Sequence, residues 1–443
     1  MKKIFFLFLI LPCFIFSQSE KSKLYSLEDC INIALSSNTN LAIFNERSKS
    51  AEAKYKEAQT SILPSLKFMG SYSRLSDIEP FSITLPPPIS QTVEVFPTLL
   101  NNTNLGLNLM QPIFTGSKLS GSIDIADFSN QAAVEDYKKQ RLDLITDIKI
   151  CYFNIIKTVQ LNKNVKENIV RIESHINDAK NMLELKQITT NDFLKIEVQY
   201  YKLKSALVET ENMVALNKLK LCNLMGVELN YDFDIAPIPF DEIEIKPLDE
   251  YLKSAISNRH DLKSIESRVK IAEKGISIAN SNWYPQVYLN ANYYYANPNP
   301  RMMPPTDKFK ESWDVGLSIS FDIWNWGATS DKVEQAKAQQ KEAELTFNSF
   351  KDLITFDVNR IYLNIMQMKE SLIFQRKAVE QAEEDFRISK EKFEKGYLSS
   401  SDLLDSETSL YETTVAYINT QMDYNIAIAT LENISAIINA VKD

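Results

Sequence analysis

The 443-residue chain has only 9 glycines, 4 cysteines and 2 histidines, and these shortages exclude several classes of protein. No glycine-rich phosphate loop, histidine–cysteine cluster or nucleophile elbow occurs, so we expect no enzyme, no cofactor and no metal site. Cys30, Cys151 and Cys222 are odd in number and widely spaced, which predicts buried free thiols rather than a disulfide framework. His175 and His260 lie in charged helical stretches and are expected to face solvent.

Long hydrophobic runs are also missing, apart from residues 4–16. Lys2 and Lys3 precede that run and small polar residues follow it, which predicts a secretory signal peptide over 1–19. Cys13 lies inside the run, a position that disfavours a lipid acceptor. No later stretch is apolar for the length of a membrane-spanning helix, so any membrane crossing must use strands. The net charge of −9, with both signs interspersed, argues against nucleic acid as a partner.

Proline is absent from 113–236 and from 306–443, and such gaps favour long uninterrupted helices. A helix from about 330 to 395 would be roughly 100 Å long at 1.5 Å per residue, more than a compact domain requires. In the second gap, apolar residues alternate between spacings of three and four, which is typical of a coiled-coil seam. They are Ile354, Val358, Ile361, Ile365, Met368, Leu372, Val379, Ala382, Phe386 and Phe393. The expected helices span 27–63, 118–186, 190–225, 249–282, 329–395 and 400–438.

The sequence is duplicated. Eleven residues between Leu27 and Tyr72 recur 221 positions later, and further along the spacing becomes 210, as in the pair Glu197 and Glu407. We therefore divide the chain into a first repeat over 20–226, a linker over 227–247 and a second repeat over 248–443. Two copies are too few for a solenoid, and a duplicated element that completes a symmetric assembly is the more natural interpretation.

Each expected long helix is followed by a break and a second helix, so each repeat contains a helical hairpin with a tight tip. The segments 189–192 and 399–402 supply residues that cap the start of a new helix, and Gly396 supplies the break in the second repeat. Lys186 stands where the second repeat has Gly396. We therefore expect the first turn to differ in detail.

Four segments alternate apolar and polar residues with a period of two, and they predict strands over 66–75, 104–113, 286–295 and 313–323. The edge of a soluble β-sandwich would give the same pattern. Length, alternation and terminal aromatic residues together favour transmembrane strands. Four strands cannot close a barrel, so the barrel must be shared between two, three or four chains. The aromatic residues expected at the membrane interface are Tyr72, Tyr293, Tyr295, Trp313 and Trp324.

With these features in place, the sequence resembles the TolC-like outer-membrane efflux proteins over nearly the whole mature chain. The duplication carries the resemblance, together with the strand-to-helix junctions at 109–116 and 315–327 and the hairpin tip from 393 to 405. The resemblance implies a homotrimer in the outer membrane, with a 12-stranded β-barrel continued by an α-helical tunnel in the periplasm. It also implies that 227–247 packs around the middle of the tunnel. A periplasmic adaptor protein and an inner-membrane pump would hand substrate to the tunnel.

The family has an acidic pair at the periplasmic gate, and this pair matches Asp402 and Asp405. Three copies would place six carboxylates around one aperture, which attracts cations. Asp402 is equally an N-cap residue, as is Asp192. Phe393 and Leu398 depart from the latch of the best-known member, and Lys195, which corresponds to Asp405, is expected to make an acid–base contact between hairpins instead. The adaptor is expected to dock at the tips, on Lys186, Gln187, Ile188, Gly396, Tyr397 and Leu398.

The sequence thus predicts the outer-membrane channel-tunnel of a tripartite efflux or type I secretion system. Drugs, metal ions and exported polypeptides all stay open as substrates. The alternative is a periplasmic coiled-coil adaptor or scaffold without a pore, which leaves the four alternating strands unexplained. An enzyme embedded in a barrel is a third interpretation, and it lacks a catalytic set.

Overall fold

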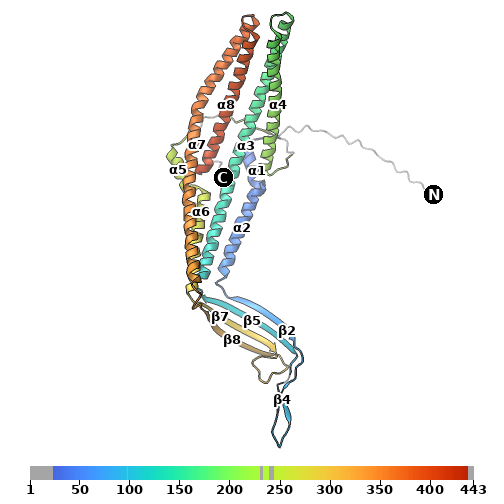
Figure 1. Ribbon diagram of the computed structural model, residues 1–443, viewed down its shortest axis with the longest axis vertical. Helices are drawn as coiled ribbons and strands as arrows, with labels where there is room; N and C mark the ends of the chain where they lie inside the picture. Colours follow the sequence, from blue (N-terminus) through green and yellow to red (C-terminus); the bar gives the residue numbers. More distant parts are fainter. Residues whose placement is uncertain (1–22, 97, 230–232, 239–243, 438–443) are drawn as a thin grey trace, which may run out of the picture.

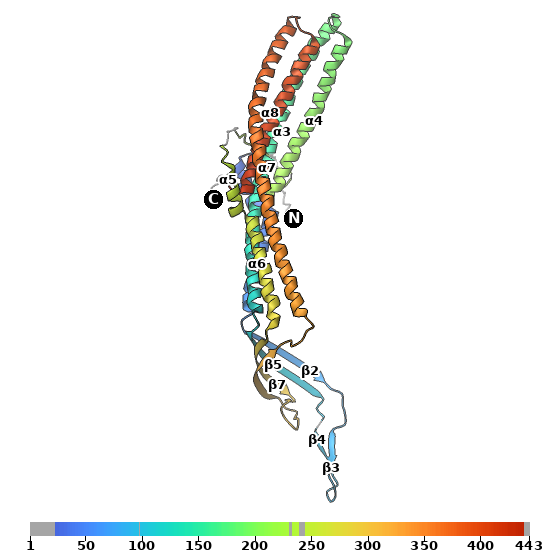
Figure 2. The same cartoon turned by 60° about the vertical axis from the view of Figure 1, so that its left-hand side comes forward.

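The computed structural model describes residues 23–96, 98–229, 233–238 and 244–437, and the signal peptide expected over 1–19 lies outside them. The molecule is elongated, with long helices along one axis and a four-stranded sheet at one end (Figure 1). The view turned by 60° shows the same division (Figure 2). Within the described ranges, no helix combines the length and the apolar character needed to cross a membrane.

The described residues form eight α-helices, four in each repeat. Those of the first repeat are α1 (Leu27–Ser37), α2 (Thr39–Thr60), α3 (Lys118–Glu184) and α4 (Thr190–Met225). Those of the second repeat are α5 (Leu248–Asn258), α6 (His260–Asn280), α7 (Ala328–Glu394) and α8 (Ser400–Ser435). A 3-10 turn, η1 (Ser281–Trp283), follows α6.

The element boundaries reproduce the duplication. The helices α7 and α8 begin and end 210 residues after α3 and α4, with equal lengths of 67 and 36 residues. The helix α5 begins and ends 221 residues after α1, and both have 11 residues. Each repeat therefore contributes a short helix pair, two strands of the sheet and one long helical hairpin.

Two expected helices are each broken once, so the predictions over 27–63 and 249–282 were wrong as single helices. Asn38 has an extended backbone (φ −68°, ψ 117°) between α1 and α2. Its side-chain oxygen accepts a hydrogen bond from the Leu41 N–H at 2.9 Å, and its amide donates to the Leu224 carbonyl at 2.8 Å. An asparagine that caps the second helix and anchors to α4 favours the break over a continuous helix.

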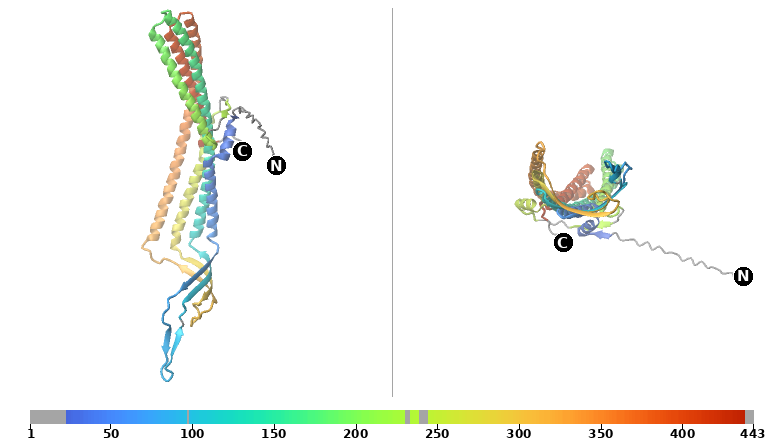
Figure 3. Two further views of the ribbon diagram at one scale, coloured as in Figure 1. Left: turned by 90° about the vertical axis from the view of Figure 1, so that its right-hand side faces the viewer. Right: turned by 90° about the horizontal axis from the view of Figure 1, so that it is seen from below.

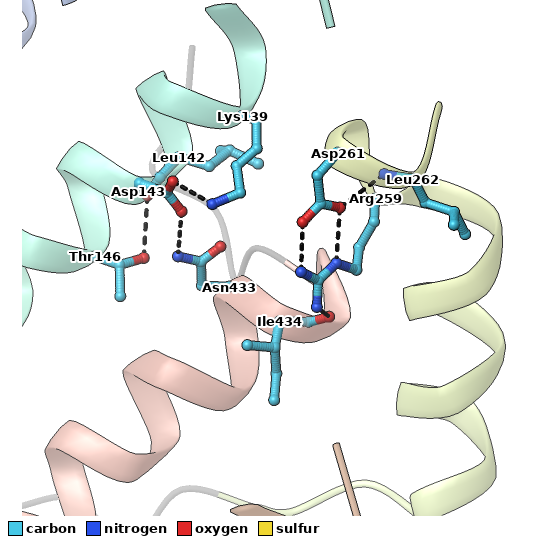
Figure 4. Close-up of polar contacts among 9 residues, drawn as sticks. All are labelled: Lys139, Leu142, Asp143, Thr146, Arg259, Asp261, Leu262, Asn433 and Ile434. Carbon is cyan, nitrogen blue, oxygen red and sulfur yellow. Dashed lines mark hydrogen bonds and ion pairs between the residues drawn. The ribbon is translucent and has the colours of Figure 1, made fainter. Parts of the chain in front are cut away.

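Arg259 makes the corresponding break between α5 and α6, with φ −60° and ψ 129°. Its guanidinium donates to both carboxylate oxygens of Asp261 and to the Ile434 carbonyl near the end of α8, at 3.1 Å (Figure 4). In the same view, Asn433 donates to Asp143 of α3 at 3.1 Å. A cation at the carboxyl end of a helix is favourable, because the last carbonyls lack partners within the helix. Arg259, at the break, therefore binds the carboxyl end of α8.

The four-stranded sheet has the order β2-β5-β7-β8, and every neighbouring pair is antiparallel. Its strands are β2 (Ser65–Arg74), β5 (Asn101–Phe114), β7 (Gln286–Asn297) and β8 (Lys310–Ser320). All four lie where strands were expected, with ends displaced by up to three residues. The strand β8 stops at Ser320, so the expected continuation to residue 323 was wrong.

The two faces of the sheet differ in polarity, because paired residues share a face. One row runs through Phe68, Leu107, Tyr293 and Trp313. A row on the opposite face runs through Lys67, Asn108, Asn292 and Asp314. In the polar row, Asn108 donates to Asn292 at 2.6 Å and Asn292 donates to Asp314 at 2.8 Å.

Two smaller sheets were missed by the sequence analysis. The strands β3 (Phe81–Thr84) and β4 (Thr92–Phe96) form a hairpin within the proline-rich segment after β2, and it projects beyond the main sheet (Figure 1). The strand β1 (Lys23–Tyr25) pairs in parallel with β6 (Phe233–Ile235), which belongs to the expected linker over 227–247. Strands of three to five residues are too short to show a clear period of two.

A buried apolar core lies where α1, α3 and α4 of the first repeat meet β6 of the linker. The Tyr152 hydroxyl lies 2.6 Å from the Ala236 carbonyl and 3.1 Å from the Tyr25 carbonyl, so it ties α3 to both short strands. Burial raises the pKa of Tyr152 to about 12. Cys30, Cys151 and Cys222 are buried and free, as predicted, and burial raises the pKa of Cys30 to about 12. A second core forms between α5, α7 and α8.

We predict that Arg259→Gln lowers the thermal unfolding midpoint most near neutral pH. Burial alone would raise the pKa of Asp261, but hydrogen bonds and charge from Arg259 hold it below its usual value. A carboxylate with a lowered pKa adds stability above its unfolded pKa, about 4, and loses it as the pH falls through the folded pKa. The deficit of the variant, measured by circular dichroism at pH 7 and pH 3, should therefore shrink in acid.

Arg268→Gln is the matched control for that experiment. Arg268 pairs with Asp136 at 3.0 Å, but the two side chains are 62% and 34% exposed. Exposed ion pairs contribute little to stability, so this variant should unfold near the wild-type temperature. Equal losses in the two variants, or a deficit of Arg259→Gln that is the same at both pH values, would contradict the assignment.

Candidate functional site

The tips of the two helical hairpins lie at the end of the molecule opposite the sheet (Figure 1). The first turn places Lys186 in the left-handed region (φ 58°), and the second places Gly396 there (φ 77°). The Gln187 N–H donates to Met182 and the Tyr397 N–H donates to Lys392, both at 2.8 Å. The two turns therefore share one geometry, and the expectation that they differ was wrong. Lys186 accepts a backbone conformation that glycine adopts without strain.

Thr189 and Ser399 are the N-cap residues, so the expectation that Asp192 and Asp402 are the N-caps was wrong, and the two aspartates occupy the equivalent third position of α4 and α8. The Asp192 N–H donates to the Thr189 hydroxyl at 3.2 Å, and the Asp402 N–H donates to the Ser399 hydroxyl at 3.1 Å. Each hydroxyl in turn donates to the carboxylate of its aspartate at 2.7 Å. The hydrogen bonds from Thr189 lower the pKa of Asp192. Both aspartates thus stabilise the start of a helix, whatever else they do.

The remaining residues expected at the gate are exposed. Asp405 lies one turn after Asp402 on α8 with its side chain open to solvent. Lys195 lies 3.9 Å from Asp192 on its own helix. Its expected contact with Asp405 of another hairpin stays a prediction.

The residues expected to dock an adaptor form the outermost surface of the tips. Lys186, Gln187 and Tyr397 are exposed, and 80% of the Tyr397 surface is open to solvent. Ile188 and Leu398 are half-buried at the foot of each turn. An aromatic ring with that exposure at a helix–helix turn has few contacts within its own chain.

The aromatic residues expected at the membrane interface are exposed on the apolar face or at the ends of the sheet. The Tyr72 hydroxyl donates to the Asn101 side-chain oxygen at 3.1 Å, and the Tyr293 hydroxyl donates to Glu311 at 3.0 Å. Tyr295 stacks on Phe309 with ring centroids 5.0 Å apart. Trp313 lies at one end of β8, and Trp324 follows its other end. Rings with a polar tip at both ends of an apolar face are typical of an interface belt.

The sequence analysis missed a buried polar cluster near the tips, and the expectation that His175 faces solvent was wrong. His175 of α3 is only 2% exposed. Its Nδ1 lies 3.0 Å from Glu407 of α8, and its Nε2 lies 2.9 Å from the Ser400 hydroxyl. Phe393 of α7 packs edge-on against the imidazole, with centroids 5.3 Å apart. The cluster joins α3 to the other hairpin.

A signal for this cluster was present in the spacing. His175 continues the stripe of Val165, Asn168, Ile172 and Ala179 on α3, all of which are buried. A histidine at that spacing belongs to the buried face of the helix. His260 also has a partner, since its Nδ1 lies 2.7 Å from Glu135 of α3. Within the described residues, no three potential metal ligands lie together.

Comparisons with known proteins agree with this architecture. A profile of the family described as outer membrane efflux protein matches residues 30–227 and 251–436. The toxin and drug export protein A of Aggregatibacter actinomycetemcomitans is 22% identical over 60% of this chain, and the match spans 57% of that relative's length. The outer membrane protein TolC of Vibrio cholerae is 20% identical over 74% of this chain and 75% of its own.

The fold is shared with solved structures. The Campylobacter jejuni CmeC outer membrane channel superimposes with a TM-score of 0.80 and 16% identity, over 92% of this chain and 85% of that one. A mainly helical body with a small β portion is therefore common to both. The profile covers most of both repeats, and the relatives are named as outer-membrane or export proteins. The chain belongs to the outer membrane efflux protein family and is an outer-membrane protein that extends into the periplasm.

Proposed function

We propose that this protein is the outer-membrane channel-tunnel of a tripartite efflux or type I secretion system, working as a homotrimer. The observation that carries the proposal is an apolar helix face without a partner in the single chain. Ile418 of α8 is 8% exposed, whereas its equivalent on α4, Val208, is 68% exposed. The same position is thus covered in one repeat and open in the other.

The complementary face lies on α7. Phe356 and Phe374 are 63% and 68% exposed, whereas their equivalents on α3, Thr146 and Asn164, are buried. A chain that leaves large apolar side chains open on two different helices has a heterologous interface, and such contacts close into a ring when the rotation permits. Seen along the long axis, the chain describes an open arc (Figure 3, right). Further copies of the arc would complete a tunnel wall.

The sheet supports the same assembly. The strands β2 and β8 are its two ends, and its apolar face carries exposed Phe68, Leu317 and Ile319. An apolar face in lipid requires that both edges be paired, because unsatisfied backbone groups cost several kcal/mol each. Three chains would supply twelve strands and pair every edge. The polar row through Asn108 and Asn292 would then face a water-filled interior.

No chemical step is needed for this function. Substrate would enter at the hairpin tips from a periplasmic adaptor protein and an inner-membrane pump, and leave through the barrel. One relative is named a toxin and drug export protein, and another is named an outer membrane protein. These names fit a role in export and do not specify a substrate for this chain. We assign the gate to Asp402 and Asp405, with Asp192 and Lys195 beside it, and adaptor docking to the exposed turns. A scaffold without a pore would leave the apolar face of the sheet unexplained.

The first test is the oligomeric state of Val208→Arg. If α4 packs against α7 of another copy, the wild type in detergent is a trimer by native mass spectrometry, and this variant dissociates because an arginine cannot be buried in an apolar contact without a partner. Val170→Arg is the control. Val170 is equally exposed (65%), on α3, which already packs against both α4 and α8. A monomeric wild type, or a trimeric Val208→Arg, would refute the assembly.

The second test separates a gate from a helix cap. Asp402→Asn with Asp405→Asn removes the charges and keeps a capping residue, whereas Ser399→Ala weakens the cap and keeps the charges. In planar bilayers the wild type should show small cation-selective currents, since a ring of carboxylates attracts cations. The double variant should lose that selectivity and Ser399→Ala should keep it. Selectivity that is the same in all three proteins would move the gate elsewhere.

A further inference from the structure

The segment 75–100, which contains the β3–β4 hairpin, forms an arm at one corner of the main sheet. It projects beyond the end of the sheet that lies away from the helices (Figure 2). The Leu75 N–H donates to the Leu100 carbonyl at 2.7 Å, and the Thr98 hydroxyl donates to the Ile78 carbonyl at 2.9 Å. These hydrogen bonds continue the pairing of β2 with β5 into the base of the arm. Since the helices extend into the periplasm, the arm lies on the outer side of the membrane.

The hairpin of the arm has one apolar face, and the single chain leaves that face open. Ile83 pairs with Val93, and Phe81 lies two residues before Ile83 on the same face. The next pair, Thr84 with Thr92, points to the opposite face, where the two hydroxyls lie 3.0 Å apart. Phe81, Ile83 and Val93 are 59%, 47% and 43% exposed. The apolar face therefore still has surface to bury against another molecule.

The charge of the arm is complementary to that of the loop between β7 and β8. The arm has no lysine or arginine, and its three acidic residues are Asp77, Glu79 and Glu94. The segment 298–310 has one acidic residue, and its three basic residues are Arg301, Lys308 and Lys310. All six of these side chains are exposed. The loop also offers apolar surface, since Met303 is 84% exposed. Opposite charge and open apolar surface together favour contact between an arm and a loop.

Closing the sheet in the trimer brings an arm and a loop of different copies together. This step rests on the proposed function, in which β2 of one copy pairs with β8 of the next. The strand directions alternate along the sheet, so this new pair is antiparallel. The outer end of β2, at Arg74, then meets the start of β8, at Lys310 of the partner subunit. The arm follows the first residue in the chain, and the loop precedes the second, so both emerge at the same corner.

We propose that the arm of each copy docks on the 298–310 loop of the partner subunit and forms a clasp between copies outside the membrane. The apolar face of the hairpin covers the exposed apolar surface of the loop, and the acidic residues of the arm lie near the basic residues of the loop. The loop of the same chain lies on the other side of the arm, beside β5, and leaves the apolar face open. The occupant of this face is therefore a second copy of the chain.

Two charge-reversed chains test whether the contact joins different copies. One carries Asp77→Lys with Glu79→Lys, and the other carries Lys308→Glu with Lys310→Glu. Trimers of either chain alone have like charges at every clasp, whereas mixed trimers contain clasps with opposite charges. Co-expression with tags of different mass should therefore give more mixed trimers, by native mass spectrometry, than random mixing gives. High salt during assembly should reduce the excess, because it screens exposed charges. Wild-type chains with the two tags are the control and should mix at random.

The outcomes separate this inference from the proposed function. Wild-type chains that form no trimer would refute the proposed function itself. Trimers in which the two reversed chains mix at random would overturn the clasp alone. A contact between an arm and the loop of its own chain does not depend on which chain is the neighbour, so it would also give random mixing.

A second measurement tests the apolar face. Ile83→Ser should lower the temperature at which trimers dissociate in detergent by several degrees, because it places a hydroxyl in an apolar contact. Thr84→Ser is the matched control, since it changes the opposite face of the same strand and keeps a hydroxyl there. Its trimers should dissociate at the wild-type temperature. Equal dissociation temperatures for the two variants would contradict docking of this face on a partner and would favour lipid as its occupant.

Discussion

The structure depends on apolar helix surface that one chain cannot cover. In each repeat the long hairpin presents a face to the next hairpin along, and only one of the two faces finds a partner within the chain. Ile418 is buried, whereas Val208 at the equivalent position is exposed. Hydrophobic stabilisation scales with the apolar area removed from water, so a face of this length would stabilise the proposed association of copies. The open sheet edges impose the same requirement at the membrane end.

Much of this arrangement could be read from the sequence because the signals were long. Proline-free stretches and seams with spacings of three and four predicted α3, α4, α7 and α8 to within two or three residues. The alternating segments predicted all four strands of the main sheet. Periodicity accumulates over many residues, so a long helix or a ten-residue strand stands out against chance.

The features that the sequence did not predict depend on single residues and on distant partners. The break at Asn38 is fixed partly by the Leu224 carbonyl, and the break at Arg259 by the end of α8. His175 was wrongly predicted to face solvent, because its neighbours in the sequence are charged while its partner Glu407 lies in the other hairpin. Local composition says nothing about a partner 232 residues away, and only the 3.6-residue stripe on α3 placed it on the buried face.

The ion pairs between the two hairpins of the chain distinguish the repeats, and they bear on how copies would pack in the proposed trimer. Lys149 pairs with Glu432 at 2.8 Å and Lys157 with Asp423 at 2.9 Å, all between α3 and α8. Their equivalents in the other repeat are uncharged: Asn359 with Cys222, and Gln367 with Met213. The Lys149 and Glu432 side chains are 15% and 13% exposed, so in the proposed trimer they would lose a largely desolvated partner if α3 packed against α4 of another copy. The more exposed pair of Lys157 and Asp423 would contribute less. In the proposed trimer, the charges would therefore favour α8 over α4 as the neighbour of α3 and leave the apolar faces of α4 and α7 to each other. Every hairpin would then have one correct neighbour on each side, which a closed ring of repeats requires.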